Sequence, residues 1–235
     1  MTVTEKLAAL RQNMEASIGF IKKVKTEIPD IILENCASGG HKLEPLMMSL
    51  CAMASFSDAH ETEEIPIIAA NLHRAILPRQ SQIWAVIRKT DSLKRIAYSI
   101  ANTFLGRMCL SGDVMELNPA QWEVIDRGIA FYKQAVPIIK HGFTHRVGSH
   151  ITSERHPKGW QGVVRVGERD AVGSALVVIH CFYGGYPEVI EIQLPADCPQ
   201  KVASTYSDTP IEIGVRDGVL TYKTSEDMKA AAVLL

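Results

Sequence analysis

The stretch from Gln82 to Phe104, QIWAVIRKTDSLKRIAYSIANTF, contains one complete strand and one complete helix. Its first part, Gln82–Ile87, is an apolar run of the length typical of a buried strand. Asp91 follows in the position of a helix cap. After it, apolar residues recur at the spacing of one helix face: Leu93, Ile96, Ile100 and Phe104.

Three further strand and helix units flank this one. Their strands are predicted in the apolar runs Ile31–Cys36, Met53–Ser57 and Arg107–Leu110. Their helices are predicted to begin at Pro45, at Pro66 and, with Asn118 as cap, at Pro119. Alternating strands and helices indicate parallel strands joined by crossover helices. Four such strands form either a small open sheet or half of an eight-stranded barrel, whose functional residues follow the carboxyl ends of the strands.

A long amphipathic helix comes before the first of these strands. Thr2 and Glu5 have the spacing of a capping box, and Pro29 is expected to end the helix. One face of this helix is apolar, with Leu7, Leu10, Met14, Ile18, Ile21 and Ile28.

The pattern changes after Gly142. The segments GWQGVVRVGER, ALVVIHCFY, VIEIQLP and GVLTYKTS are short β-branched or alternating runs, separated by Gly, Pro and Asp. They predict an antiparallel β-sandwich. The chain is therefore divided into an α/β part at residues 1–142 and an all-β part at residues 143–235.

The composition is that of an ordinary globular protein. The formal net charge is −1 and no basic block occurs, so neither nucleic acid nor an anionic membrane is an expected partner. The five cysteines include no CxxC pair, which favours reduced thiols. No apolar run approaches the roughly 20 residues of a membrane span, and the N-terminus lacks the apolar core of a signal peptide. The expected location is the cytoplasm.

Two polar segments that follow predicted strands are candidates for chemistry. Asp58 ends the run at Met53–Ser57 and is either a general acid/base or an ordinary loop or capping aspartate. Cys36 precedes two glycines, which allow the backbone to approach a ligand closely or simply form a tight turn. For Cys36 to act as a nucleophile it would need a base, and His41 is the nearest histidine in the sequence.

Other residues give weaker signals. The histidines at 141, 145, 150 and 156 lie close together in sequence, but their spacing and the absence of a nearby carboxylate or cysteine favour a surface linker over a metal site. Core packing is the expected role of Met47, Met48, Met53, Trp84 and Trp122. No metal or organic cofactor is implied.

Four segments, ENCASGGHKLEP, SFSDAHE, LPRQSQIW and GRMCLSGDVMEL with a later FYK, occur in this order. Together they resemble the carboxyl-terminal half of glycoside hydrolase family 36, the melibiase-type α-galactosidases, over nearly the whole chain. The resemblance implies that residues 1–142 are the C-terminal half of a (β/α)8 TIM barrel, with strands five to eight. It also implies that residues 143–235 are the β-sandwich which follows the barrel in this family.

The same resemblance implies roles for particular residues. The family hydrolyses terminal α-galactosides with retention and uses two aspartates, and its general acid/base corresponds to Asp58. Cys36 and Gly39 correspond to residues that hold the galactose ring, with Ser38 and Gly40 shaping the loop. The nucleophile of the family lies in a Lys-Trp-Asp-x-Asn motif, which this sequence does not contain. Asp113 ends the last predicted strand, but nothing in the sequence gives it the nucleophile's place.

Three positions depart from the family pattern and bear on the sugar specificity. Ser55 stands where the family often has Trp, and His41 and Lys42 stand where it often has Gly and Arg. The family also includes galactosyl transferases and enzymes that act on N-acetylgalactosamine. We therefore expect either an α-galactosidase fragment that carries the acid/base, or an inactive product or weak sugar binder. In both cases the half-barrel is expected to self-associate or to pair with an N-terminal half.

Overall fold

The computed structural model describes residues 2–36, 39–40, 42–55 and 62–235. Four parallel strands form the first sheet, β1 (Glu34–Cys36), β2 (Met53–Ser55), β3 (Ser81–Ile87) and β4 (Arg107–Gly112). They lie in the order β1-β2-β3-β4, so each strand pairs with the next one along the chain. This is the arrangement that alternating strands and helices predict.

The helices between these strands are α2 (Pro45–Leu50), α3 (Glu64–Leu72) and α4 (Leu93–Thr103), and α5 (Pro119–His141) follows β4. Asn118 and Gln121 form a capping box at the start of α5, with Pro119 in its first turn as expected. Two predicted helix starts were wrong. Helix α3 begins at Glu64, so Pro66 lies inside its first turn, and Ser92 rather than Asp91 caps α4.

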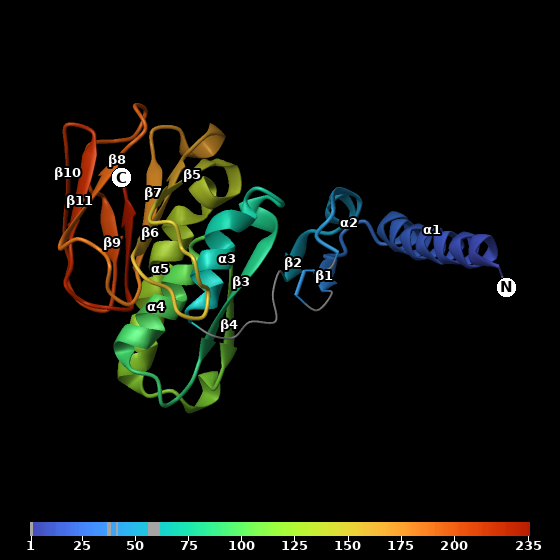
Figure 1. The fold of residues 1–235 in the computed structure, drawn as a ribbon, viewed down its shortest axis with the longest axis horizontal. Helices are drawn as coiled ribbons and strands as arrows, with labels where there is room; N and C mark the ends of the chain where they lie inside the picture. The colour runs from blue at the N-terminus through green and yellow to red at the C-terminus, as the bar shows by residue number, and fades with distance from the viewer. Residues whose placement is uncertain (1, 37–38, 41, 56–61) are drawn as a thin grey trace.

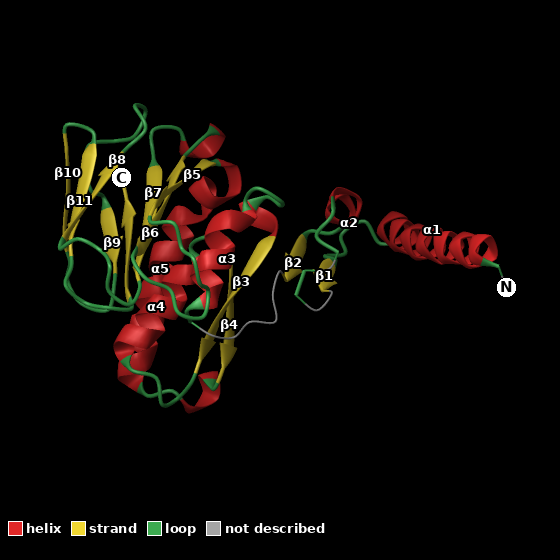
Figure 2. Ribbon diagram, in the orientation of Figure 1, coloured by secondary structure: helices red, strands yellow, loops and turns green. Residues whose placement is uncertain are grey.

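Two antiparallel sheets make up the C-terminal part (Figures 1 and 2). The five-stranded sheet has the order β5-β6-β7-β12-β9, and the three-stranded sheet has the order β10-β11-β8. The strands of the larger sheet are β5 (Phe143–Gly148), β6 (Trp160–Val166), β7 (Ala175–Cys181), β9 (Ser204–Tyr206) and β12 (Lys229–Leu234). Those of the smaller sheet are β8 (Val189–Gln193), β10 (Glu212–Arg216) and β11 (Val219–Lys223).

The five-stranded sheet is covered on both faces, because every residue of β7 and β12 is buried. Leu176 and Val178 of β7 belong to a core shared with α4 and α5. Val177 and Ile179, which point to the opposite face, belong to a second core with the three-stranded sheet. Helices α4 and α5 and the five-stranded sheet therefore share one hydrophobic core, whereas Met48 of α2, Ala54 of β2 and Ile76 form a separate small cluster.

Helix α1 (Val3–Glu27) stands apart from these layers (Figure 1). It has the predicted capping box of Thr2 and Glu5 and ends before Pro29. No residue of α1, all of which the structure describes, is buried. Its apolar face is therefore not part of either core.

Two general features of the described chain bear on the earlier expectations. No helix among the described residues is long and apolar enough to cross a membrane. All five cysteines, each of them described, are free thiols.

Candidate active site

One face of the parallel sheet is covered by helices and the other is open. In β3, Ile83, Ala85 and Ile87 are completely buried and belong to the core that contains α4 and α5. Gln82 and Trp84 alternate with them and are only half-buried. Since neighbouring side chains on a strand point to opposite faces, Gln82 and Trp84 lie on the open face.

Residues of all four strands meet in one row on this open face. Cys36 of β1 is paired with Ser55 of β2, Ser55 with Gln82 of β3, and Gln82 with Arg107 of β4. Residues paired in register share a face of the sheet. The last residues of β1 and β2 are therefore direct neighbours, and the chain segments that follow them leave from the same place.

The loop after β1 is shaped by two glycines and one asparagine. Gly39 and Gly40 have φ angles of 77° and 88°, in the left-handed region that favours glycine. Asn35, which is buried, donates its Nδ2–H to the carbonyl of Lys42 at 2.7 Å. Because Asn35 belongs to β1, this hydrogen bond ties the far end of the loop back to the strand. Cys36 is exposed at the start of the loop.

Asp58 and Ser38 lie outside the described residues, so their predicted roles remain predictions. The described residues on either side of the segment with Asp58 are well anchored. Ser55 and Thr62 are both buried, and Glu63 accepts a hydrogen bond from the hydroxyl of Tyr183 at 2.9 Å.

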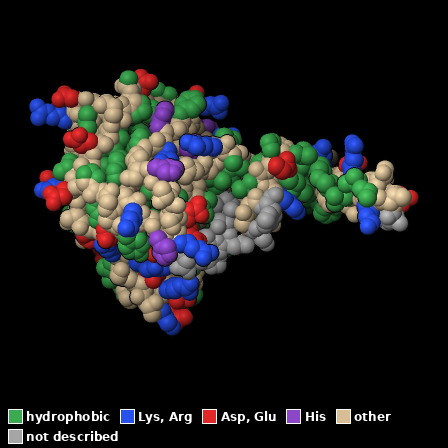
Figure 3. Space-filling view, viewed as in Figure 1, with side chains coloured by type: hydrophobic (Ala, Val, Ile, Leu, Met, Phe, Trp, Pro, Cys, Tyr) green, Lys and Arg blue, Asp and Glu red, His purple; other side chains and the backbone are tan. Residues whose placement is uncertain are grey.

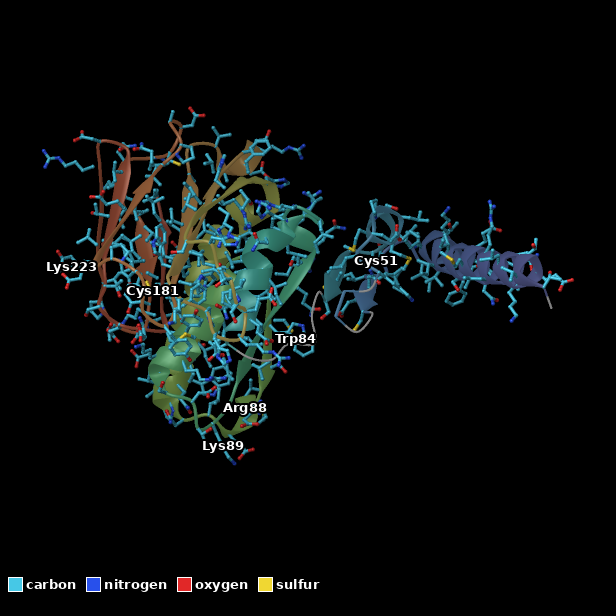
Figure 4. All side chains as sticks on the ribbon, in the orientation of Figure 1. Cys51, Trp84, Arg88, Lys89, Cys181 and Lys223 are labelled. Atoms are coloured by element: carbon cyan, nitrogen blue, oxygen red, sulfur yellow. The ribbon has the colours of Figure 1, made fainter. Side chains whose placement is uncertain are left out.

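Asp113 lies at the carboxyl ends of β3 and β4. Its carboxylate accepts a hydrogen bond from the backbone N–H of Lys89 at 3.2 Å, and its own N–H donates to the carbonyl of Ile87 at 2.8 Å. Figure 4 places Arg88 and Lys89 on the turn beyond β3. The side chain of Asp113 is therefore held by the neighbouring turn after β3, which is an ordinary structural role.

Core packing is the expected role of Trp84, which Figure 4 labels on β3. It alternates with the buried residues of β3, so it lies on the open face, where it is paired with Cys109 of β4. The structure places it only half-buried, although it also packs on the edge of the core. Burial raises the pKa of the Cys109 thiol, and a hydrogen bond with Gln82 offsets part of this rise. The alternation of Gln82 and Trp84 with three small or branched apolar residues was the signal that could have identified this face.

The described part of the chain contains no group of three or more His, Cys, Asp or Glu side chains that could hold a metal ion. Of the four clustered histidines, His145 lies within β5, and His141 lies at the end of α5 with its Nε2 3.8 Å from a carboxylate oxygen of Asp170. These two histidines are therefore not in a linker, whereas His150 and His156 lie in the loop between β5 and β6. A cavity of about 690 Å³ lies near the amino ends of the strands, lined among others by Gln80, Arg107 and Lys140, and therefore away from the loop after β1.

Comparisons with known proteins give a match in structure alone. No family model and no curated protein sequence matches the chain. The α-galactosidase from Lactobacillus brevis aligns with a TM-score of 0.77 at 16% identity, over 100% of this chain and 33% of that one. The galactosidase domain of the α-galactosidase–sucrose kinase AgaSK gives a TM-score of 0.68 at 15% identity, over 92% of this chain and 30% of that one. A variant of the family 36 α-galactosidase AgaA from Geobacillus stearothermophilus, crystallised with raffinose, gives 0.68 at 17% identity, over 91% and 30%.

These structural matches involve nearly all of this chain, which spans only about a third of the length of each of these proteins. The α/β part and the β-sheets are both included, since coverage of this chain reaches 91% or more in each case. The chain has the fold of the C-terminal portion of glycoside hydrolase family 36 α-galactosidases.

Proposed function

We propose that this chain supplies the acid/base and part of the sugar-binding surface of a retaining α-galactosidase. The observation that carries the proposal is the pairing of Cys36 with Ser55 at the ends of β1 and β2. This pairing starts the glycine loop and the segment leading to Asp58 from adjacent points on the open face. The strand order and the likeness to α-galactosidases support the view that β1 to β4 are strands five to eight of a TIM barrel.

In the proposed reaction Asp58 acts twice. As a general acid it gives its proton to the glycosidic oxygen of the leaving group, while a second carboxylate attacks the anomeric carbon and forms a glycosyl ester. As a general base it then takes a proton from the water that opens this ester. Cys36 and Gly39, with Ser38 and Gly40 in the same loop, hold the galactose ring through the reaction.

The proposed substrate is an α-galactoside oligosaccharide. Variants of the AgaA α-galactosidase have been crystallised with raffinose and with stachyose. The open polar face beside an exposed loop fits a ligand that carries many hydroxyl groups. The second carboxylate of the reaction is proposed to come from a strand with the Lys-Trp-Asp-x-Asn motif, which is absent from this sequence.

A second candidate function is sugar binding without catalysis. It applies where Asp58 meets no nucleophile, because removing one member of a catalytic unit commonly lowers turnover by several orders of magnitude. The two candidates share the galactose-binding loop and differ in whether Asp58 meets a nucleophile.

A hybrid protein separates the two candidates. Residues 1–235 replace the matching C-terminal third of the L. brevis α-galactosidase, and hydrolysis of 4-nitrophenyl α-galactoside is measured. We expect turnover that Asp58→Asn lowers by about 10²–10⁴-fold, whereas Asp113→Asn, the matched control, changes it little. Added azide, which attacks the glycosyl ester without a base, is expected to restore turnover in Asp58→Asn.

Normal turnover in Asp58→Asn would show that another residue is the acid/base. A folded hybrid that binds 1-deoxygalactonojirimycin but hydrolyses nothing would favour the binding function.

A further inference from the structure

Hydrogen bonds from the β part reach the start of helix α3. The hydroxyl of Tyr183, in the loop after β7, donates to Oε1 of Glu63 at 2.9 Å. Gln161 of β6 is completely buried, and its Nε2–H donates to the carbonyl of Pro66 at 2.8 Å. Figure 3 shows the β part and the helices beside it as one continuous body. The start of α3 is therefore held by side chains of the β part.

Tyr183 lies in a loop that is itself fixed. Its backbone N–H donates to the carbonyl of Pro157 at 3.2 Å, and the N–H of Gly184 donates to a carboxylate oxygen of Asp227 at 2.8 Å. Partial burial, and then the hydrogen bond to Glu63, raise the pKa of the Tyr183 hydroxyl, so it keeps the proton that it donates. Glu63 is the cap residue of α3 but makes no capping hydrogen bond with its side chain. Its carboxylate therefore serves the contact with the β part instead.

This contact lies close in sequence to the proposed acid/base. Glu63 stands five residues after Asp58, and Ser55 stands three residues before it. Ser55 is buried at the end of β2, where it is paired with Cys36 and Gln82. Because a chain reaches at most about 3.3–3.6 Å per residue, the positions open to Asp58 depend on both ends of this segment. The sheet fixes the first end, and the β part helps to fix the second.

We propose that Tyr183 is a positioning residue for the acid/base: by holding Glu63 it fixes the end of the segment from which Asp58 reaches the glycosidic oxygen. The inference rests on the proposed function. In this role Tyr183 acts through the chain and does not contact the substrate. Small displacements of a reacting group lower the rate steeply, so one hydrogen bond at the end of the segment affects turnover. The β part, in which no catalytic residue is proposed, thereby contributes to catalysis.

The choice of leaving group separates positioning from a purely structural role. A hydrogen bond that only joined two parts of the fold would affect all substrates alike. A general acid matters most for a poor leaving group, such as the sugar alcohol released from raffinose, which must be protonated as it departs. It matters little for 4-nitrophenolate, which departs readily as an anion. Comparing kcat/KM for the two substrates therefore reports on the acid rather than on stability or galactose binding.

The first experiment uses the hybrid enzyme described above. Tyr183→Phe removes only the hydroxyl and is expected to lower kcat/KM about tenfold for raffinose and less than about twofold for 4-nitrophenyl α-galactoside. Tyr186→Phe is the matched control, because the hydroxyl of Tyr186 also donates to a carboxylate, that of Asp227 at 2.8 Å, but not to α3. It is expected to change neither value. Thermal unfolding of both variants checks that the fold is kept.

Changes at Glu63 test the same contact from the other side. Glu63→Ala is expected to reproduce the effect of Tyr183→Phe, and combining the two changes should add nothing further. Glu63→Gln keeps an oxygen that accepts from Tyr183 and should keep most of the activity on raffinose. Glu64→Ala is the neighbouring control, because Glu64 forms only a loose pair with Arg155, 3.7 Å apart, and the Arg155 side chain is 85% exposed.

Asp58→Asn in the same hybrid separates this inference from the function on which it rests. We expect Asp58→Asn to lower kcat/KM far more for raffinose than for 4-nitrophenyl α-galactoside. If it does so, but Tyr183→Phe lowers both values equally or neither, Tyr183 is not a positioning residue and the proposed function stands. If Asp58→Asn shows no dependence on the leaving group, the proposed function fails and this inference fails with it.

The second experiment uses the chain by itself. Hydrogen exchange in the peptide of residues 56–66 is expected to be about fivefold faster in Tyr183→Phe than in the unchanged chain, because losing a hydrogen bond favours local opening. Tyr186→Phe is expected to leave this exchange unchanged. Equal exchange in Tyr183→Phe and the unchanged chain would overturn the proposal, whatever the activity of the hybrid.

Discussion

Asn35 holds the glycine loop of the candidate site by donating its Nδ2–H to the carbonyl of Lys42 at 2.7 Å. Asn35 is buried on the helix-covered side of β1, whereas Cys36, the next residue, is exposed on the open side. In β1, Asn35 therefore fixes the loop, and Cys36 faces the side on which the sugar is proposed to bind.

The first prediction concerns this hydrogen bond. Asn35→Ala is expected to cost about 1–2 kcal/mol of folding free energy and to weaken the binding of 1-deoxygalactonojirimycin about tenfold, because a looser loop must be ordered when the sugar binds. Calorimetric titration and thermal unfolding check both values. Asn71→Ala is the control, since its amide also donates to a backbone carbonyl, that of Ile67, but lies away from the loop. Equal losses of affinity in both variants would contradict the role of Asn35.

The second prediction uses the backbone of the same loop. Gly39→Ala and Gly40→Ala place a side chain in the left-handed region, and each is expected to destabilise the chain by about 1–2 kcal/mol. Gly19→Ala in α1 is the matched control with the opposite expectation. A Cβ added there meets no atom within 4 Å, and alanine favours a helix over glycine by about 1 kcal/mol. Denaturant unfolding that gave the same sign for Gly19→Ala and Gly39→Ala would contradict the assigned conformations.

The third prediction concerns a buried histidine between the helices and the five-stranded sheet. His180 of β7 meets Tyr98 of α4 with ring centroids 5.2 Å apart in an edge-on arrangement. Within the described chain neither ring nitrogen of His180 has a hydrogen-bond partner. Burial lowers the pKa of His180 to about 3, so the folded protein holds the ring neutral.

The sign of the pH effect follows from this shift. Below the ordinary pKa of about 6.5 the unfolded chain binds a proton that the folded chain does not. The contribution of the neutral His180 to stability is therefore fully present above about pH 6.5 and is lost as the pH falls toward 3. Between pH 7 and pH 5 the loss from His180 alone is about 2 kcal/mol. His180→Leu is expected to remove this part of the pH dependence, while His150→Leu, at an exposed position, leaves it in place. Denaturation at both pH values gives the comparison.

The strand and helix units of residues 31–141 could be predicted from the sequence because each signal is local. The capping box at Thr2, the cap at Asn118 and the apolar runs of β3 and β4 depend only on neighbouring residues. Helix α3 begins two residues before Pro66, because proline is tolerated throughout the first turn, where backbone N–H groups have no partner within the helix. Asp91 was expected to cap α4, but its side chain accepts a hydrogen bond from the N–H of Arg88 and leaves the cap to Ser92.

Long-range relationships could not be predicted in the same way. The pairing of β12 with both β7 and β9 joins segments far apart in the sequence, and no local pattern specifies its register. The spacing of apolar residues in α1 predicts an apolar face, but it does not indicate whether other parts of the chain cover that face. Only the structure shows that the chain itself leaves it exposed. The site is predicted by resemblance, whereas the open face is indicated by the sequence of β3 itself, in which Gln82 and Trp84 alternate with buried residues.

The last prediction concerns a buried ion pair in the β part. Lys229 of β12 is buried, and its Nζ lies 2.7 Å from a carboxylate oxygen of Asp208 and 2.8 Å from the hydroxyl of Thr209. Burial alone would raise the pKa of Asp208, but the hydrogen bond and charge of Lys229 lower it below its ordinary value. Lys229→Met keeps most of the buried stem but leaves this carboxylate without its cation, and the expected loss is about 3 kcal/mol. The contribution of Asp208 to stability is present above its unfolded pKa and is lost as the pH falls. The destabilisation caused by Lys229→Met should therefore be smaller in acid.

Lys223→Met is the matched control, because Lys223 and Glu212 form an exposed pair at 3.3 Å that is expected to contribute less than about 1 kcal/mol. Denaturant unfolding of both variants at pH 7 and pH 4 measures the difference. Equal losses in the two variants would mean that Lys229 contributes no more than a surface charge.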